Sequence, residues 1–164
     1  MECLRVLSVR SGGESARIYI RQGGSRVCVA QHEGTQQLRH VVRIGEEMPL
    51  WAGASGHVLL IGGSARTLSR VAAAAGRGPD FASVLAERAR LAAERGFAVS
   101  HGERADGVSA VAAPVTDAAG QVVAAVGLGG PTSRFTEERV ESFCPALAEA
   151  AKRLSELGFL GGSG

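Results

Sequence analysis

The sequence predicts an α+β domain in which an antiparallel sheet is flanked by helices. Two observations lead to this fold class. Short runs rich in β-branched residues open the chain and return after its middle, and Ala-rich segments with helical periodicity fill the centre and the end. The chain has 164 residues, of which 45% are hydrophobic, so it is long enough to bury the core of one domain.

The first expected elements are two strands that form a hairpin. Residues 15–21 and 25–31 are β-rich runs, and Gln22, Gly23 and Gly24 join them. A Gly-Gly turn between two such runs is typical of a hairpin. A third strand is expected at residues 37–44, in which alternation places His40 on the same face as apolar side chains, namely Leu38, Val42 and Ile44.

Residues 48–60 combine a proline-containing turn, several small residues and the start of an apolar helix. Gly and Ala allow a bound molecule to approach the backbone closely, and Ser55 offers a hydroxyl and a backbone donor in the first helical turn. This pattern predicts a ligand-binding corner. The alternative is a tight loop that is packed for its own sake.

Two helices are expected next, at residues 64–75 and 80–95. Ala and Arg dominate both segments, residues 76–79 separate them, and Gly96 is a natural C-terminal stop. These helices are expected to cover one side of the sheet.

The last third of the chain predicts a second antiparallel pair and a closing helix. The strands are expected at residues 108–116 and 121–128, joined by a turn at residues 117–120. A long amphipathic helix is expected from about Thr136, with apolar residues at three- and four-residue spacing: Val140, Phe143, Leu147, Ala151, Leu154 and Leu157. Pro145 should kink this helix or mark a restart within it.

Small residues line one face of each strand in the second pair. Alternation puts Val108, Ala110 and Ala112 on one face of the first strand, and it puts Val123, Ala125, Gly127 and Gly129 on one face of the next. Neighbouring faces of small residues leave a concavity unless large side chains from elsewhere fill it. A pocket is therefore expected, and close packing of a helix on the sheet is the alternative.

The order and spacing of five motifs resembles the effector-binding domain of the IclR family of bacterial transcription regulators, from about Ser15 to Gly158. The motifs are Gly45-x-x-x-Pro49-Leu50, Ala54-Ser55-Gly56, residues 96–103, Ala112-Ala113-Pro114-Val115 and Gly129-Gly130-Pro131. The resemblance implies a GAF-like fold with the effector held between the sheet face and its bordering loops.

Carried over by position, the family's effector pocket falls on Gln37, His40, Ala54, Ser55, Ser100, Val108, Ala110, Gly127 and Gly129. Ser100 stands where some members place an acid, and the two glycines stand where some place serines. These departures predict a larger and less polar cavity that suits an aromatic or other bulky organic metabolite, with a carboxylate held by His40, Ser55 and backbone amides. A hydrogen-bonded core histidine is the alternative for His40. Trp51 is expected to pack over the corner, and Glu103 to tie down its loop.

The resemblance also implies an organisation and a mechanism. Residues 1–14 would be the end of an interdomain linker, residues 15–158 the effector-binding domain and residues 159–164 a flexible tail, with the family's N-terminal winged helix-turn-helix absent from this chain. Effector binding would alter operator binding by that missing domain, which alone contacts DNA. A homodimer or homotetramer is implied, and no cofactor.

Composition excludes several classes of protein. The 18 Lys and Arg residues against 16 Asp and Glu give a net charge of +2 with no basic block, which does not indicate non-specific binding of nucleic acid. Cys3, Cys28 and Cys144 lack ligand spacing, which fits a reducing compartment, and the cytoplasm is the expected location. No apolar run is long enough to span a membrane.

Catalysis and metal binding are not expected. The Ser55 segment resembles a nucleophile elbow, but His57 stands where that motif needs glycine. Cys28 is expected to be a buried structural thiol. The pairs at residues 32–33 and 101–103 lack the spacing of dedicated metal ligands. Two alternative functions remain: a GAF-like enzyme that uses cysteine redox chemistry, and an oligomerisation module without a ligand.

Overall fold

A computed structural model of the chain describes residues 1–38 and 41–158. Its described part contains a six-stranded antiparallel sheet with the order β3-β2-β1-β6-β5-β4. The strands are β1 (Ser15–Gln22), β2 (Ser25–His32), β3 (Glu47–Pro49), β4 (Ala98–His101), β5 (Val108–Thr116) and β6 (Val122–Pro131). The α+β class with an antiparallel sheet and flanking helices is thus confirmed.

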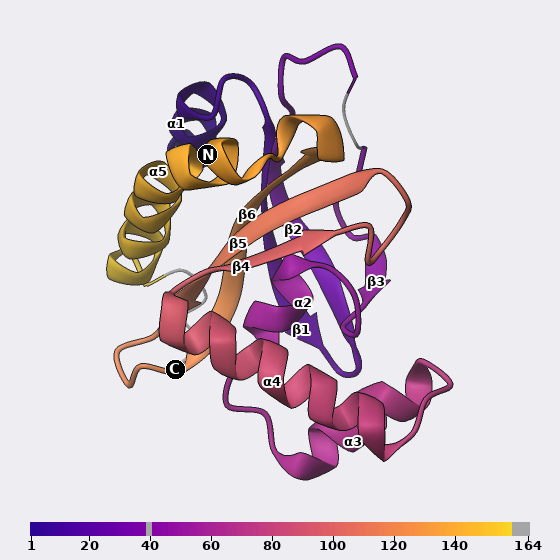
Figure 1. Ribbon diagram of the computed structural model, residues 1–164. Helices are drawn as coiled ribbons and strands as arrows, with labels where there is room; N and C mark the ends of the chain where they lie inside the picture. Colours follow the sequence, from indigo (N-terminus) through magenta and orange to yellow (C-terminus); the bar gives the residue numbers. More distant parts are fainter. Residues whose placement is uncertain (39–40, 159–164) are drawn as a thin grey trace.

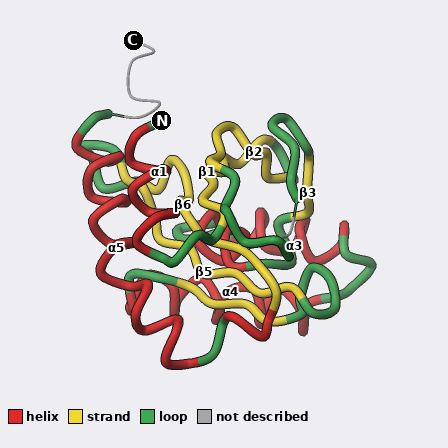
Figure 2. The backbone as a smooth tube through the Cα atoms, turned by 90° about the horizontal axis from the view of Figure 1, so that it is seen from above, coloured by secondary structure: helices red, strands yellow, loops and turns green. Residues whose placement is uncertain are grey.

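Helices cover both faces of this sheet (Figure 1). The helices are α1 (Glu2–Arg10), α2 (Ala54–Leu59), α3 (Ala65–Ala74), α4 (Pro79–Arg95) and α5 (Glu137–Glu156), and a 3-10 turn, η1 (Thr132–Arg134), precedes α5. Helices α1 and α5 pack side by side on one face, while α2, α3 and α4 lie on the other, as the view from above also shows (Figure 2). The sheet is therefore the middle layer between two apolar cores.

The core beneath α1 and α5 uses one side of the central strands. Ile18 of β1, Val111 of β5 and Val126 of β6 are fully buried there, together with Phe143 and Leu147 of α5. The helix α1 also contributes Leu4 and Leu7 to this core. Residues 2–10 are therefore packed into the domain, whatever precedes them in a longer protein.

The second core lies on the opposite face, between the sheet and α2 to α4. Cys28, Val58, Leu85 and Ala125 are among its buried residues. The helix ends follow the expected signals: Ser64 caps α3 by accepting a hydrogen bond from the Thr67 amide, and Gly96 ends α4 in the left-handed conformation. Both helices and the hairpin of β1 and β2 are where the sequence predicted them.

The expected third strand at residues 37–44 is wrong. Its described residues, 37–38 and 41–44, form no strand, and the chain pairs with β2 only at Glu47–Pro49. Of the predicted apolar face, Leu38 and Ile44 are 69% and 56% exposed, whereas Val42 is 1% exposed and packs into the core beside α2 to α4 without strand pairing. His40 lies outside the described residues.

Two further differences concern β4 and α5. No strand was predicted between the helix ending at residue 95 and residue 108, whereas Ala98–His101 pairs antiparallel with β5 at the sheet edge. The α5 helix runs without interruption from Glu137 to Glu156, so a restart at Pro145 is wrong. Thr136 caps this helix at its start, as expected. The expected tail at residues 159–164 lies outside the described residues.

Candidate functional site

The small-residue faces of β5 and β6 meet as the sequence predicts. Ala110 pairs with Gly129 and Ala112 pairs with Gly127 across the two strands. A Cβ atom at Gly127 would lie 2.4 Å from the Val111 carbonyl oxygen, so this position accepts only glycine without a shift of the backbone. The two strands approach closely here, and their small residues form a floor on the face of the sheet that carries α2 to α4.

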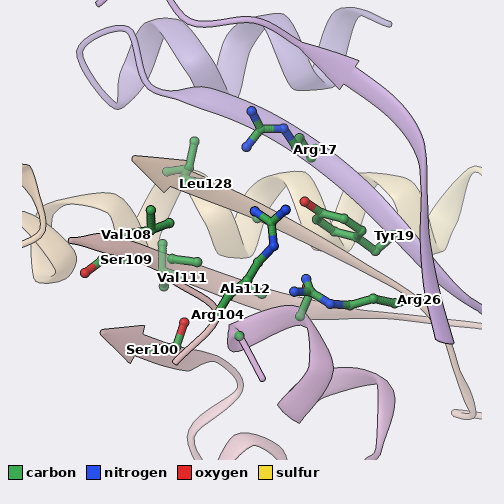
Figure 3. Close-up of a pocket in the computed structure, with 15 residues that line it drawn as sticks. Arg17, Tyr19, Arg26, Ser100, Arg104, Val108, Ser109, Val111, Ala112 and Leu128 are labelled. Atoms are coloured by element: carbon green, nitrogen blue, oxygen red, sulfur yellow. The ribbon is translucent and has the colours of Figure 1, made fainter. Parts of the chain in front are cut away.

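A cavity of about 40 Å³ lies over this floor. Figure 3 shows that its walls come from β1, β2, β4 and the loops that border them. Of the nine positions expected to bind the effector, six line this cavity: Ser55, Ser100, Val108, Ala110, Gly127 and Gly129. The sequence therefore located the floor and one wall of the cavity.

Two expected positions, Gln37 and Ala54, do not line the cavity, and a third lies outside the described residues. Gln37 is exposed in the loop after β2 and is not among the lining residues. Ala54 is fully buried behind the wall, where its amide N–H donates a 3.0 Å hydrogen bond to the Ser100 hydroxyl. No position can be given for His40, which lies outside the described residues.

The side chains that give the cavity its polarity were not expected from the sequence. Arg17 and Tyr19 reach it from β1, Arg26 from β2, and Arg104 from the loop between β4 and β5 (Figure 3). Arg17 and Arg26 are each only 3% exposed. The described lining residues include these three arginines and no Asp or Glu.

Arg26 is held by neutral oxygens and an aromatic ring. Its Nε donates a 3.0 Å hydrogen bond to the Pro49 carbonyl, its Nη1 donates to the Ser55 hydroxyl, and its guanidinium lies 5.0 Å from the centroid of the Tyr19 ring. Burial lowers the pKa of Arg26 from its usual value, and burial also raises the pKa of Tyr19. Both directions follow from the burial of this wall, where Arg26 and Tyr19 are only 3% and 8% exposed.

Gly53 leaves the space in which the Arg26 side chain ends. Its φ is 95°, a left-handed value that favours glycine, and a Cβ atom there would lie 2.8 Å from Arg26 Nη2. In this structure the group that approaches the small residues of the corner is a side chain of the protein itself, and close approach of a bound molecule there stays a prediction.

Glu103 ties the loop between β4 and β5 to the corner, as expected. Its Oε1 accepts hydrogen bonds from the Gly53 amide (3.1 Å) and His57 Nε2 (2.8 Å), and it lies 3.4 Å from Arg88 Nη1. Burial disfavours the carboxylate, but the hydrogen bond and charge of His57, the Gly53 amide and the charge of Arg88 outweigh it and lower the pKa of Glu103.

Two amides of the corner are consequently already engaged. The Gly53 N–H bonds to Glu103 and the Ala54 N–H bonds to Ser100, so neither is directed at the cavity. The expectation of a large, weakly polar cavity with backbone amides as ligands does not agree with this geometry. Guanidinium groups provide the donors, and Ser55 contributes its hydroxyl.

At the mouth of the cavity, Arg104 approaches a carboxylate of the loop after β2. Its Nη2 lies 4.0 Å from Glu46 Oε2, a buried oxygen that accepts no hydrogen bond from the described residues. On the other wall, Arg17 Nε donates to Gln31 Oε1 at 3.4 Å. Among the described residues, Glu46 is therefore an acid that faces Arg104.

The missed arginine of β1 could have been found from side-chain alternation, because the sheet is covered on both faces and neither face of this strand is free. In β1, Ala16, Ile18 and Ile20 face the α1 and α5 side, which leaves Arg17 and Tyr19 on the other. A charged residue inside a covered sheet is costly unless a polar site receives it. Arg104 could not be predicted in this way, because it lies in a loop and only the tertiary fold brings this loop to the cavity.

The geometry does not support a catalytic or metal centre in the described part of the chain. Cys28 is fully buried and burial raises the pKa of its thiol, which opposes formation of a reactive thiolate. The described residues contain no group of three or more His, Cys, Asp or Glu side chains placed to hold a metal ion. None of the described helices has both the length and the apolar character needed to cross a membrane.

Comparison with protein families gives one match that spans most of the chain. Residues 2–156 match the family model described as "Bacterial transcriptional regulator IclR C-terminal". Among curated proteins, the HTH-type transcriptional repressor AllR of Salmonella typhi is 31% identical over 152 residues, which cover 87% of this chain. The match covers 55% of that relative, so the chain spans about half the length of the curated relatives it matches.

Solved structures agree with this match. A transcriptional regulator of the IclR type from a Rhodococcus species superposes with a TM-score of 0.90 at 44% identity, covering 95% of this chain and 61% of that one. The IclR protein of Thermotoga maritima superposes with a TM-score of 0.82 at 27% identity, covering 95% of this chain and 65% of the other. The GAF-like fold that the resemblance implies is confirmed by these structures.

Proposed function

This chain belongs to the IclR family of bacterial transcriptional regulators, in which it corresponds to the C-terminal domain, and we propose that its cavity binds a small organic carboxylate as the effector. One observation supports this choice of ligand above all. The described lining of the cavity contains three arginines and no acid, and two of these arginines are almost fully buried. Guanidinium groups match carboxylates in shape and charge.

The size of the cavity favours a ligand of few atoms. Its volume of about 40 Å³ is far below the roughly 150 Å³ of an engineered protein cavity that binds benzene. A short carboxylate therefore fits better than the aromatic metabolite that the sequence suggested. An enzyme that uses cysteine chemistry is not supported, because Cys28 is buried and the matched relatives are regulators.

Effector binding would act on DNA through a region that this chain does not include. The curated relatives are named HTH-type repressors, and about half of their length matches here. We expect occupancy of the cavity to change the relative populations of two arrangements of the assembled protein, and so to change operator affinity. Whether the effector relieves or promotes repression depends on which arrangement it binds better.

We also infer that the domain assembles into a homodimer or homotetramer. The outer face of α1 exposes Val6 and Val9, and the loop after β2 exposes Leu38, Val41 and Ile44. Exposed apolar groups of this kind are typical of surfaces that contact another subunit. Native mass spectrometry of the purified chain measures the oligomer directly, and a monomer at micromolar concentration would contradict the inference.

The test of effector binding is a thermal-shift screen of short carboxylates, small oxo-acids, aromatic acids and sugars, followed by titration calorimetry. A ligand at 100 times its Kd should stabilise the domain by about 2.7 kcal/mol. Ala110→Leu places extra atoms over Gly129 in the cavity floor and should abolish the shift. Ala73→Leu adds the same atoms on the exposed face of α3 and should not. Absence of binding by every compound would refute the proposed function.

A further inference from the structure

Arg26 is a buried cation that lacks a carboxylate partner among the described residues. It is 3% exposed, and its hydrogen bonds go to the Pro49 carbonyl and the Ser55 hydroxyl. Its guanidinium lies over the Tyr19 ring, which is attracted to the charge without neutralising it. Buried charges in proteins are normally paired, since removing an ion from water is costly.

The acids nearest to Arg26 are engaged elsewhere. Glu103 interacts with Arg26 only through space, and its carboxylate is bonded to His57 and the Gly53 amide and is close to Arg88. Glu46 faces Arg104 at the rim. Arg17 and Arg104 add further positive charge to the same cavity. Arg26 therefore keeps a buried positive charge that no acid of the described residues pairs directly.

Both the strand and the corner hold the Arg26 side chain in one place. Residue 26 begins the second strand of the hairpin and pairs with Met48 of β3, while Ser55 and Gly53 receive its guanidinium at the start of α2. A fixed guanidinium loses little conformational freedom when it binds an anion. Figure 3 shows this group directed into the cavity, below Tyr19 and beside Arg104.

We propose that Arg26 is the residue that determines effector specificity, because its guanidinium binds the carboxylate of the ligand and requires the ligand to be negatively charged. This inference rests on the proposed function and assigns its selectivity to one residue. The ligand supplies the counter-charge that the fold withholds from Arg26. Carboxamides of the same shape lack that charge and are rejected.

The test compares each carboxylate with its own amide by titration calorimetry, using propionate with propionamide and pyruvate with pyruvamide. The wild-type chain should bind at least one of the two carboxylates at least tenfold more tightly than the matching amide. Arg26→Gln should weaken binding of that carboxylate roughly 30-fold or more, since truncating one partner of a buried charge pair has effects of this size. The preference for carboxylate over amide should disappear in the same variant.

Two further variants keep this test decisive. Arg26→Lys retains the charge but not the planar donor pair, so it should recover part of the affinity and the whole preference for the charged ligand. Arg66→Gln removes an exposed arginine from α3 and should change neither. Circular dichroism and thermal unfolding establish whether each variant is folded. If Arg26→Gln does not fold, the binding data of Arg26→Lys decide the test.

The outcomes separate the two proposals. If neither carboxylate nor amide binds the wild-type chain, and the wider screen also finds no ligand, the proposed function fails. If a carboxylate binds and Arg26→Gln retains both its affinity and its preference over the amide, only the role of Arg26 is overturned. Equal binding of carboxylate and amide to the wild-type chain would overturn that role as well. Inorganic phosphate binding in place of every carboxylate would show an anion site with a different ligand, and would also overturn the inference.

Discussion

At the scale of single residues, Gly127 and Gly129 differ in what they tolerate although both lie in the cavity floor. A Cβ atom at Gly127 would meet the Val111 carbonyl oxygen at 2.4 Å, whereas one at Gly129 would meet the end of the Arg17 side chain at 3.3 Å. Backbone cannot move aside as a flexible side chain can. A side chain at Gly127 and one at Gly129 are therefore not equivalent replacements in this chain.

We expect Gly127→Ala to destabilise the domain by about 1–3 kcal/mol, which is typical of overpacking at a rigid site. Gly129→Ala should cost less, because Arg17 can shift. Urea unfolding of both variants, monitored by circular dichroism, measures the difference. Equal losses of stability would show that the close contact between β5 and β6 at Gly127 is not limiting.

Glu103 predicts a dependence of stability on pH. The pKa of this carboxyl is lowered in the folded protein, so the unfolded chain takes up its proton first as the pH falls. The stability that Glu103 contributes is therefore present at neutral pH, and it is lost as the pH falls from the ordinary value of about 4.3 through the lowered pKa.

Glu103→Gln should reduce the free energy of unfolding at pH 7 by about 1–3 kcal/mol, because His57 and Arg88 lose a charged partner. The gap between variant and wild type should narrow as the pH falls below about 4.3. Urea unfolding at several pH values provides the comparison. A constant gap across this range would mean that the carboxylate charge does not stabilise the fold.

The sequence could identify small residues at the cavity but not the charges that define it. Val108, Ala110, Gly127 and Gly129 follow from strand alternation and the family resemblance. Arg17 and Arg26 were visible within expected strands, but their burial depends on helices that cover the sheet from both sides. Whether these arginines face water or a cavity depends on tertiary packing, and the sequence of one strand does not reveal that packing.

At the scale of elements, one buried ion pair joins the start of β1 to η1 and to the loop after β2. Arg134 Nε donates to both oxygens of Glu14, which is 1% exposed, and Arg134 Nη2 donates to the Leu38 carbonyl at 2.6 Å. A bidentate pair with satisfied donors fixes the direction in which each segment enters the sheet.

Replacing Arg134 alone should lower the free energy of unfolding far more than replacing both members of the ion pair. We expect Arg134→Met to destabilise the domain by about 3–5 kcal/mol, because Glu14 remains buried without its partner. Glu14→Gln combined with Arg134→Met should recover part of this loss. Denaturant unfolding of the two single variants and the double variant gives the coupling energy, and simple additivity of the losses would contradict a buried, coupled pair.

Pro145 is expected to lower the stability of α5. The residue is exposed within an uninterrupted helix, and proline removes one backbone hydrogen bond and crowds the preceding turn. Pro145→Ala should raise the free energy of unfolding by about 1–3 kcal/mol. Ala148→Pro, on an exposed position of the same helix, is the reverse control and should lower it. A loss of stability in Pro145→Ala would show that the packing of α5 needs the proline.

Element boundaries were predictable wherever capping residues or tight turns mark them. Ser64, Gly96 and Thr136 define helix ends, and Gly23 and Gly24 define the first hairpin. Residues 37–44 misled because a period of two in hydrophobicity is necessary for a half-buried strand but not sufficient for one. No neighbouring strand pairs with the described part of that run, so Leu38 and Ile44 remain exposed while Val42 alone is buried among its described apolar residues.

At the scale of the whole molecule, the sheet separates the cavity from the layer formed by α1 and α5. All described lining residues lie on strands, at the start of α2 with the residue before it, or in the loop between β4 and β5. A ligand should therefore slow amide hydrogen exchange in residues 47–56 and 100–110 and leave α1 unchanged. Hydrogen-exchange mass spectrometry with and without saturating ligand measures this, and protection confined to α1 and α5 would place the ligand elsewhere.

The order of the strands also governs how the domain can be made. The two central strands, β1 and β6, come from opposite parts of the chain, and Ala16 faces Leu128 across them. During synthesis, the hairpin of β1 and β2 emerges long before β6, its partner in the sheet. An isolated two-stranded hairpin is barely stable in water. Such long-range pairing slows folding and leaves apolar strands uncovered during synthesis. We therefore expect nascent chains that stop before residue 122 to depend on chaperones, however stable the finished domain is.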